Sequence, residues 1–131
     1  MGIINVTPDS FSDGGKYFTK NSAVNHAMSL INDGADILDI GGESSRPGAA
    51  PISVKDELNR ILPVIKSIRK TDSVVLISID TTKSIVAKQA VEAGADIVND
   101  ISGFSLDKNM PSAVSSLDVP VILMHMKGTP L

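Results

Sequence analysis

Polar side chains stand at the ends of several short apolar segments, and these residues could do chemistry. Asn5 ends the first segment, and Asp80 and Asn99 end two later ones. A carboxylate accepts hydrogen bonds, whereas an amide both donates and accepts them. Buried Asp and Asn side chains at the floor of a site therefore predict a ligand with ring N–H groups and ring nitrogens, which is a heteroaromatic compound.

Two polar loops accompany these positions. Residues 7–15 combine Thr, Pro, Asp, Ser and Gly with one aromatic side chain, Phe11, and include Asp13. Residues 41–51 contain Arg46 and no hydrophobic run. Gly, Ser and Arg at the rim of a site suit phosphate, and Asn and Asp oxygens beside phosphate suit Mg²⁺. Together these residues predict a heteroaromatic phosphate ester or anhydride as ligand.

Each polar position also has a purely structural interpretation when it is taken alone. Asp80 and Asn99 could hold loops by hydrogen bonding to the backbone, and Asn5 could be an inward amide satisfied by its neighbours. His125 is interpreted as a core histidine, and His26 as a surface residue of a helix. The functional interpretation therefore depends on these positions lying together.

Composition and spacing exclude several classes of protein. The chain has 131 residues, a net charge of −3 and no cysteine, which excludes a basic nucleic-acid surface, disulfides and thiolate chemistry. No apolar run approaches the roughly 18 residues of a membrane span, and no secretory leader precedes the first segment, so a cytoplasmic protein is expected. Glu43 and Asp13 form a candidate acid–base pair of undefined separation, and no catalytic triad or zinc spacing is present.

Apolar periodicity predicts alternating strands and helices. Strands are predicted at residues 2–6, 37–40, 74–79, 97–98 and 119–124. Helices are predicted between them, beginning near residues 21, 53, 84 and 109. Pro63 is expected to kink the second helix or to shift its start. This alternation predicts an α/β fold with a parallel sheet and right-handed crossovers.

An internal repeat supports that order, because the segment 34–39 recurs at 94–99. It makes Asp39 and Asn99 equivalent and predicts inward polar side chains at matching depth. Two architectures fit, an open doubly wound sheet or part of a (β/α)8 barrel. No Gly-rich dinucleotide motif follows the first strand, which weakens the former. A full barrel needs about 250 residues, so this chain would supply four βα units and a fifth strand.

Two long motifs carry a resemblance to a known family. MGIINVTPDSFSDGG and GADILDIGGESSRPGA closely resemble the two signature loops of dihydropteroate synthases, and SIDTT, IVNDISG and LMHMKGTP fall at the expected later places. The resemblance covers the whole chain. It implies that residues 1–131 form a partial pterin-binding (β/α)8 domain, the N-terminal half of a TIM barrel, truncated before strands 6–8.

The resemblance also implies a reaction. In this family, 4-aminobenzoate displaces pyrophosphate from 6-hydroxymethyl-7,8-dihydropterin diphosphate and gives 7,8-dihydropteroate for folate biosynthesis. Mg²⁺ is the implied cofactor, the two small molecules are the implied partners, and a homodimer is implied for the complete protein. Stabilising a leaving pyrophosphate needs positioned charge rather than a nucleophilic side chain.

The resemblance also implies roles for single residues of this chain, at the positions that match the family's motifs. Asn5 matches the magnesium ligand, Asp13 matches a loop carboxylate near the reacting centre, and Arg46 matches an arginine that braces the closed loops. The matches to the two substrate subsites are Phe11, Ser45 and Pro47 for 4-aminobenzoate, and Asp80, Asn99, Ile101 and Met124 for the pterin.

The chain departs from the family pattern in two ways. Ser45 replaces the usual threonine, so the fit of 4-aminobenzoate or a sulfonamide is expected to loosen slightly. The family's later aspartate, lysine, arginine and histidine lie beyond these residues, so the chain alone is expected to be inactive. Two alternatives stay open, a methyltetrahydrofolate-binding corrinoid methyltransferase domain, against which both loops argue, and a non-catalytic half barrel that binds ligand or dimerises.

Overall fold

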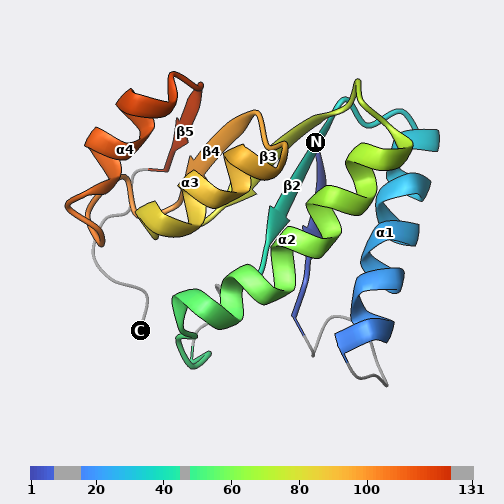
Figure 1. Cartoon of the computed structure of the whole chain (residues 1–131), viewed down its shortest axis with the longest axis horizontal. Helices are drawn as coiled ribbons and strands as arrows, with labels where there is room; N and C mark the ends of the chain where they lie inside the picture. Colours follow the sequence, from blue (N-terminus) through green and yellow to red (C-terminus); the bar gives the residue numbers. More distant parts are fainter. Residues whose placement is uncertain (8–15, 45–47, 125–131) are drawn as a thin grey trace.

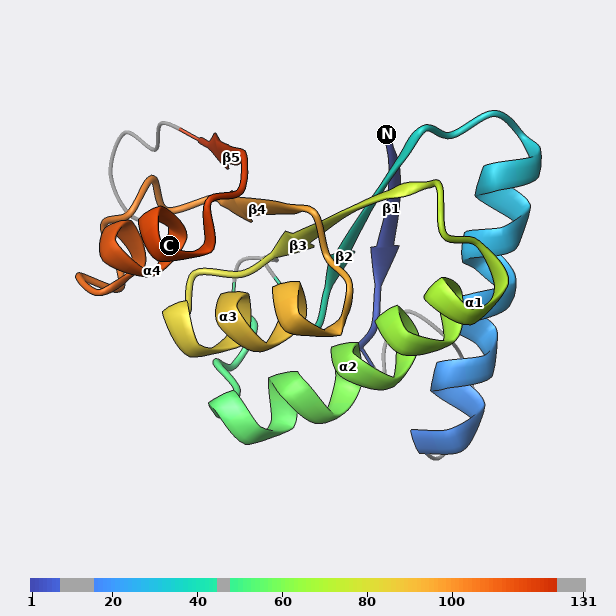
Figure 2. The same ribbon diagram turned by 45° about the horizontal axis from the view of Figure 1, so that its top comes forward.

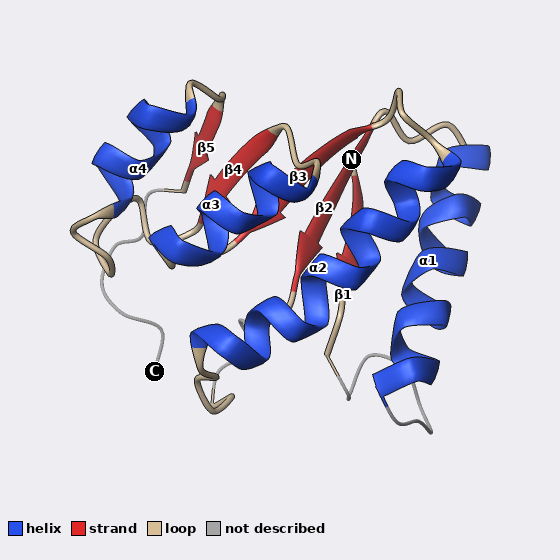
Figure 3. Cartoon of the chain, in the orientation of Figure 1, coloured by secondary structure: helices blue, strands red, loops and turns tan. Residues whose placement is uncertain are grey.

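The chain alternates between strands and helices, as predicted. The computed structural model describes residues 1–7, 16–44 and 48–124. Figures 1 and 3 show its elements, which are β1 (Gly2–Asn5), α1 (Lys16–Asn32), β2 (Ile37–Gly41), α2 (Val54–Thr71), β3 (Leu76–Asp80), α3 (Ser84–Ala93), β4 (Ile97–Asp100), α4 (Met110–Leu117) and β5 (Val121–Leu123). Among the described residues, no helix has the length and apolar character needed to cross a bilayer.

The strand order distinguishes between the two predicted architectures. All neighbouring strands are parallel, and their order in the sheet is β1-β2-β3-β4-β5. Successive helices pack against each other, and Figure 2 shows them on one face of the sheet. A doubly wound sheet reverses its strand order and carries helices on both faces. Consecutive order with one helical layer is the arrangement of half a (β/α)8 barrel.

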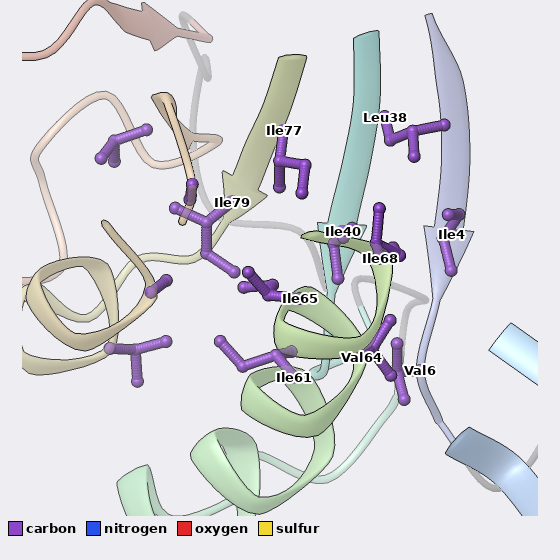
Figure 4. Packing of buried hydrophobic residues seen from close by; sticks show 14 of the residues in the cluster. Ile4, Val6, Leu38, Ile40, Ile61, Val64, Ile65, Ile68, Ile77 and Ile79 are labelled. Carbon is purple, nitrogen blue, oxygen red and sulfur yellow. The ribbon is translucent and has the colours of Figure 1, made fainter. Parts of the chain in front are cut away.

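The core lies between the sheet and this helical layer. Figure 4 shows the strand side chains of the core meeting one face of α2, and each of them is completely buried. The residues that meet there are Ile4, Leu38, Ile40, Ile77 and Ile79 from the strands and Ile61, Val64, Ile65 and Ile68 from α2. Burying each such side chain stabilises the fold by about 1.5–3 kcal/mol.

The first helix begins earlier than predicted, whereas the second begins at the predicted place. The first helix starts at Lys16 rather than near Asn21. Residues 16–20 contain no Gly or Pro, and a helix propagates readily through such residues once it is nucleated. The second helix begins as predicted after Ser53, whose Oγ accepts the N–H of Asp56 at 3.1 Å. Pro63 lies inside α2 without shifting its start.

Two strands are shorter than their apolar runs. β3 begins at Leu76 and not at Val74, a residue that is 85% exposed. The Asp72 carboxylate accepts the N–H groups of Val74 and Val75, at 2.8 and 2.9 Å, and this turn occupies the residues before the strand. β5 begins after Pro120, which has no N–H to give to a ladder.

Arg69 joins three segments at the amino ends of the strands. Its guanidinium donates to the carbonyl oxygens of Gly94 at 2.9 Å and Val75 at 2.6 Å, and to the Asp96 carboxylate. Asp96 in turn accepts the N–H of Ile77 at 2.9 Å. These contacts hold the starts of β3 and β4 to the end of α2, on the side away from the polar strand ends.

Replacing Arg69 by Lys is expected to lower the free energy of unfolding by about 1–3 kcal/mol, because an ammonium group lacks the planar fork that reaches several acceptors. Urea unfolding followed by circular dichroism measures the change. Lys70→Gln is the matched control, since Lys70 is the exposed next residue of the same helix. Equal stability of Arg69→Lys and Lys70→Gln would contradict this role of Arg69.

Candidate functional site

The carboxyl ends of all five strands form one continuous row. The Cα partners in this row are Asn5, Gly41, Asp80, Asn99 and Ile122, one from each strand. Side chains alternate between the two faces of a sheet, so the polar members of the row lie on the face opposite the helices. The structure therefore brings three of the sequence-predicted site residues to one edge of the sheet.

Asp80 lies at the centre of this row, and its environment changes its acidity. Burial raises the pKa of Asp80 to about 7 from an ordinary value of 3.8. The negative charges of four other carboxylates add to this effect: Asp39, Glu57, Asp100 and Glu43. Near neutral pH Asp80 therefore exists in both protonation states and can donate or accept a hydrogen bond.

Gly41 makes room for the carboxyl group of Asp80. A Cβ atom on Gly41 would lie 3.3 Å from Asp80 Oδ2, which is tighter than ordinary van der Waals contact. The absence of a side chain at this position in the row therefore keeps the approach to Asp80 open from the side of β2.

Asp39 and Asn99 meet on the same face of the sheet. The Asn99 amide nitrogen Nδ2 is 3.3 Å from both carboxylate oxygens of Asp39. The internal repeat predicted inward side chains for these two residues, and this contact confirms it. Their depths differ, however, because Asp39 pairs with Ser78 whereas Asn99 pairs with Asp80, the next inward residue of β3.

The structural role suggested for Asp80 and Asn99, hydrogen bonding to the backbone of a loop, belongs to Asp100 instead. Its carboxylate accepts the N–H and the Oγ–H of Ser102, at 2.8 and 2.7 Å, and the N–H of Phe104 at 3.3 Å. Within the described part of the chain, neither the Asp80 nor the Asn99 side chain bonds to the backbone. These two side chains are therefore left to face the site.

The residue pattern did not predict a partly buried ion-pair network beside the site. Lys83 Nζ lies 2.7 Å from Glu57 Oε1 and 2.8 Å from Glu43 Oε2, and the Thr81 hydroxyl donates to Glu57 Oε2 at 2.7 Å. The Glu57 side chain is 1% exposed. A signal was present, because Glu57 precedes Ile61 by one helical turn on the buried face of α2. Nothing in the sequence marked Lys83.

The network fixes the charge of Glu43. Burial opposes its ionisation, but hydrogen bonds from Lys83 and from the N–H of Ile52, at 3.0 Å, outweigh burial and lower the pKa of Glu43. Burial of its ammonium group opposes protonation of Lys83, but the hydrogen bonds to Glu43 and Glu57 outweigh burial and raise the pKa of Lys83. A carboxylate held ionised in this way is poorly suited to the acid–base pair suggested with Asp13.

The other predicted residues divide into two groups. Asn5 is exposed at the end of β1, Ile101 is half-buried directly after β4, and Met124 is exposed after β5. His26 is exposed on α1, as predicted. The remaining predicted residues lie outside the described ranges, and they are Phe11, Asp13, Ser45, Arg46, Pro47 and His125.

The raised pKa of Asp80 predicts how stability varies with pH. Between pH 3.8 and about 7 the folded state retains a proton that the unfolded state has lost. The free energy of unfolding should therefore fall as pH rises through this window, by at most about 1.4 kcal/mol per pH unit, and then level off. Glu43, with its lowered pKa, acts in more acid solution and with the opposite sign.

Asp80→Asn should remove this slope, because an amide does not titrate. Urea unfolding at a series of pH values measures it. Asp36→Asn is the matched control, since Asp36 is an exposed carboxyl group just before β2. A slope that survives Asp80→Asn unchanged would show that another group causes it.

Comparison with known proteins places this geometry in context. The chain is 54% identical over 125 residues to dihydropteroate synthase of Bacillus subtilis, a match that covers 95% of this chain and 44% of that protein. It is also 55% identical over 130 residues to the folic acid synthesis protein fol1 of Schizosaccharomyces pombe, covering 99% of this chain and 18% of that protein. The chain thus spans about half the length, or less, of these relatives.

Among solved structures, Xanthomonas albilineans dihydropteroate synthase with 4-aminobenzoic acid superposes with a TM-score of 0.91 at 49% identity, covering 98% of this chain and 46% of that one. A family described as pterin binding enzyme matches residues 1–131. The match therefore includes every strand and helix and the whole row of polar strand ends. This chain belongs to the pterin binding enzyme family.

Proposed function

We propose that the chain is the N-terminal half of the barrel of a dihydropteroate synthase. In that role it would help to join 6-hydroxymethyl-7,8-dihydropterin diphosphate to 4-aminobenzoate, with release of pyrophosphate, in folate biosynthesis. The observation that carries the proposal is the register of β3 with β4, which sets Asp80 beside Asn99 at the carboxyl ends of the strands. The names of the relatives and the matched family support the choice of reaction.

Asp80 and Asn99 would bind the edge of the pterin ring. The ring offers N–H groups and ring nitrogens, which need acceptors and donors at fixed positions. Asn99 supplies both kinds of group, and Asp80 supplies either one because its pKa lies at about 7. Ile101 directly follows β4, Met124 directly follows β5, and both would contact the ring's apolar faces.

Asn5 would hold Mg²⁺ at the entrance to this site. Within the described ranges, no group of three or more His, Cys, Asp or Glu side chains could form a protein cage for a metal. Mg²⁺ commonly keeps several waters and binds through one or two protein oxygens together with substrate phosphates, so the single exposed amide of Asn5 fits this arrangement. Bound there, the ion would neutralise charge on the departing pyrophosphate.

The proposal includes roles for the two polar loops and for the complete protein. Phe11, Ser45 and Pro47 would bind 4-aminobenzoate, Asp13 would lie near the reacting centre, and Arg46 would brace the loops. In this proposal residues 1–131 form part of one pterin-binding domain, and strands 6–8 of the complete cytoplasmic protein supply the remaining diphosphate contacts. The complete protein is proposed to be a homodimer.

A hybrid enzyme tests the proposed reaction. In this hybrid, residues 1–131 are followed by the C-terminal half of the Bacillus subtilis relative, which the match leaves uncovered. With Mg²⁺ and both substrates, the folded hybrid is expected to form 7,8-dihydropteroate, whereas the chain alone is expected to form none. A folded hybrid that consumes methyltetrahydrofolate instead, or that has no activity, would contradict the proposal.

Asp80→Asn in this hybrid should lower kcat/KM for the pterin diphosphate by about 10- to 100-fold, the effect of losing a charge-assisted hydrogen bond to a ligand. Steady-state kinetics with varied pterin diphosphate measure the change. Asp36→Asn again serves as the control and should leave kcat/KM unchanged. Equal activities of the two variants would mean that Asp80 does not contact the substrate.

A further inference from the structure

The contact between Asp39 and Asn99 crosses an intervening strand. Asp39 lies on β2 and Asn99 on β4, with β3 between them in the sheet (Figure 2). Two strands separated by a third lie about 9.5 Å apart, yet the two side chains meet at 3.3 Å. The contact therefore depends on both side chains leaning over β3 on the inward face.

A small side chain on β3 leaves space for this contact. Ser78 pairs in register with Asp39, and it is completely buried. Within the described part of the chain its hydroxyl is a buried side-chain oxygen without a hydrogen-bond partner. Its small size, rather than its hydroxyl, is what the Asp39–Asn99 contact uses.

The stability of the fold does not account for Asp39. Its side chain is buried, with the residue only 6% exposed, and the described residues give it a single donor, the amide of Asn99. A buried carboxylate with one neutral donor is costly, because its remaining acceptor positions lose water without replacement. Such a residue in the middle of an isoleucine-rich strand is more readily explained by function than by packing.

The contact selects one orientation of the Asn99 amide. A carboxylate can only accept hydrogen bonds, so the NH₂ group of Asn99 must face Asp39. The opposite orientation would set the Asn99 carbonyl oxygen against the carboxylate. With the amide held in this way, Oδ1 and the second N–H of Asn99 stay available beside Asp80.

We propose that Asp39 is a positioning residue that fixes the Asn99 amide, so that Oδ1 presents an acceptor to the ligand of Asp80. The identity of that ligand, a pterin ring with N–H donors along one edge, rests on the proposed function. The orientation of the amide does not, because both partners belong to the described part of this chain.

Solution NMR of the ¹⁵N-labelled chain tests the orientation without a ligand. In the wild type, the two Nδ2 protons of Asn99 should have well-separated chemical shifts, because one of them bonds to a carboxylate. Asp39→Leu should bring them together, and Asp39→Asn should give an intermediate separation, since an asparagine can present either group. Ser78→Ala is the matched control in the same buried layer and should keep the wild-type separation.

The hybrid enzyme tests the consequence for the ligand. Asp39→Leu should raise KM for the pterin diphosphate about 10-fold and leave KM for 4-aminobenzoate unchanged, because one hydrogen bond to the ring is misdirected. Asp39→Asn should recover part of this loss. A merely structural role for Asp39 would lower the fraction of folded enzyme and leave both KM values as they are.

Several results would overturn the proposal. One is an Asn99 signal that does not change in folded Asp39→Leu, or in Asp39→Asn if the leucine variant does not fold. Another is a changed signal with an unchanged KM for the pterin diphosphate. If the wild-type hybrid does not act on the pterin diphosphate, the proposed function fails and the assigned ligand fails with it, whereas the NMR result still decides the orientation.

Discussion

The rest of the structure depends on one constraint. Side chains alternate between the two faces of a five-stranded parallel sheet, and helices cover only one of these faces. Ile4, Ile40 and Ile79 point into the helical layer and are completely buried. The residues beside them, such as Asn5 and Asp80, must then point the other way. A slip of one residue would carry these polar groups into the core, so core packing and placement of the site are the same requirement.

This placement brings several carboxyl groups together at the carboxyl ends of the strands. Their negative charge is accommodated in two different ways. Glu57 and Glu43 share the ammonium group of Lys83, which keeps Glu43 ionised with a lowered pKa. Asp80 has no such cation close by in the described network, and burial raises its pKa to about 7. The paired carboxylates therefore hold the edge of the site together, while the unpaired one stays able to exchange a proton or a hydrogen bond.

Local patterns predicted much of the fold. The third helix begins at the predicted residue, Ser84, and its apolar stripe ends at a glycine with positive φ, Gly94. Predictions were wrong where a second local interaction opposed the apolar pattern. At Val74 the apolar run predicted a strand, but the Asp72 side chain accepts the N–H of Val74 in a turn before the strand begins. Periodicity alone left open the choice between a barrel and a doubly wound sheet. The resemblance of the two long motifs predicted half a barrel, and the consecutive strand order confirms this prediction.

Some residues of the site were predicted from the sequence, and one of its contacts was not. Asp80 and Asn99 were identified because they end apolar strands, and the internal repeat linked Asn99 to Asp39. The link from Lys83 to Glu57 was not predictable, since its partners come from separate elements and meet only after α2 and α3 have packed. Contacts of this kind depend on tertiary geometry, and no periodicity encodes them.

A crystal structure of the protein with 6-hydroxymethylpterin monophosphate tests the central claim most directly. The account predicts that the edge of the ring lies within hydrogen-bond distance of the Asp80 carboxyl and the Asn99 amide, with the Asn99 NH₂ group still on Asp39. A ring bound elsewhere, or bound with these side chains turned away from it, would contradict the account.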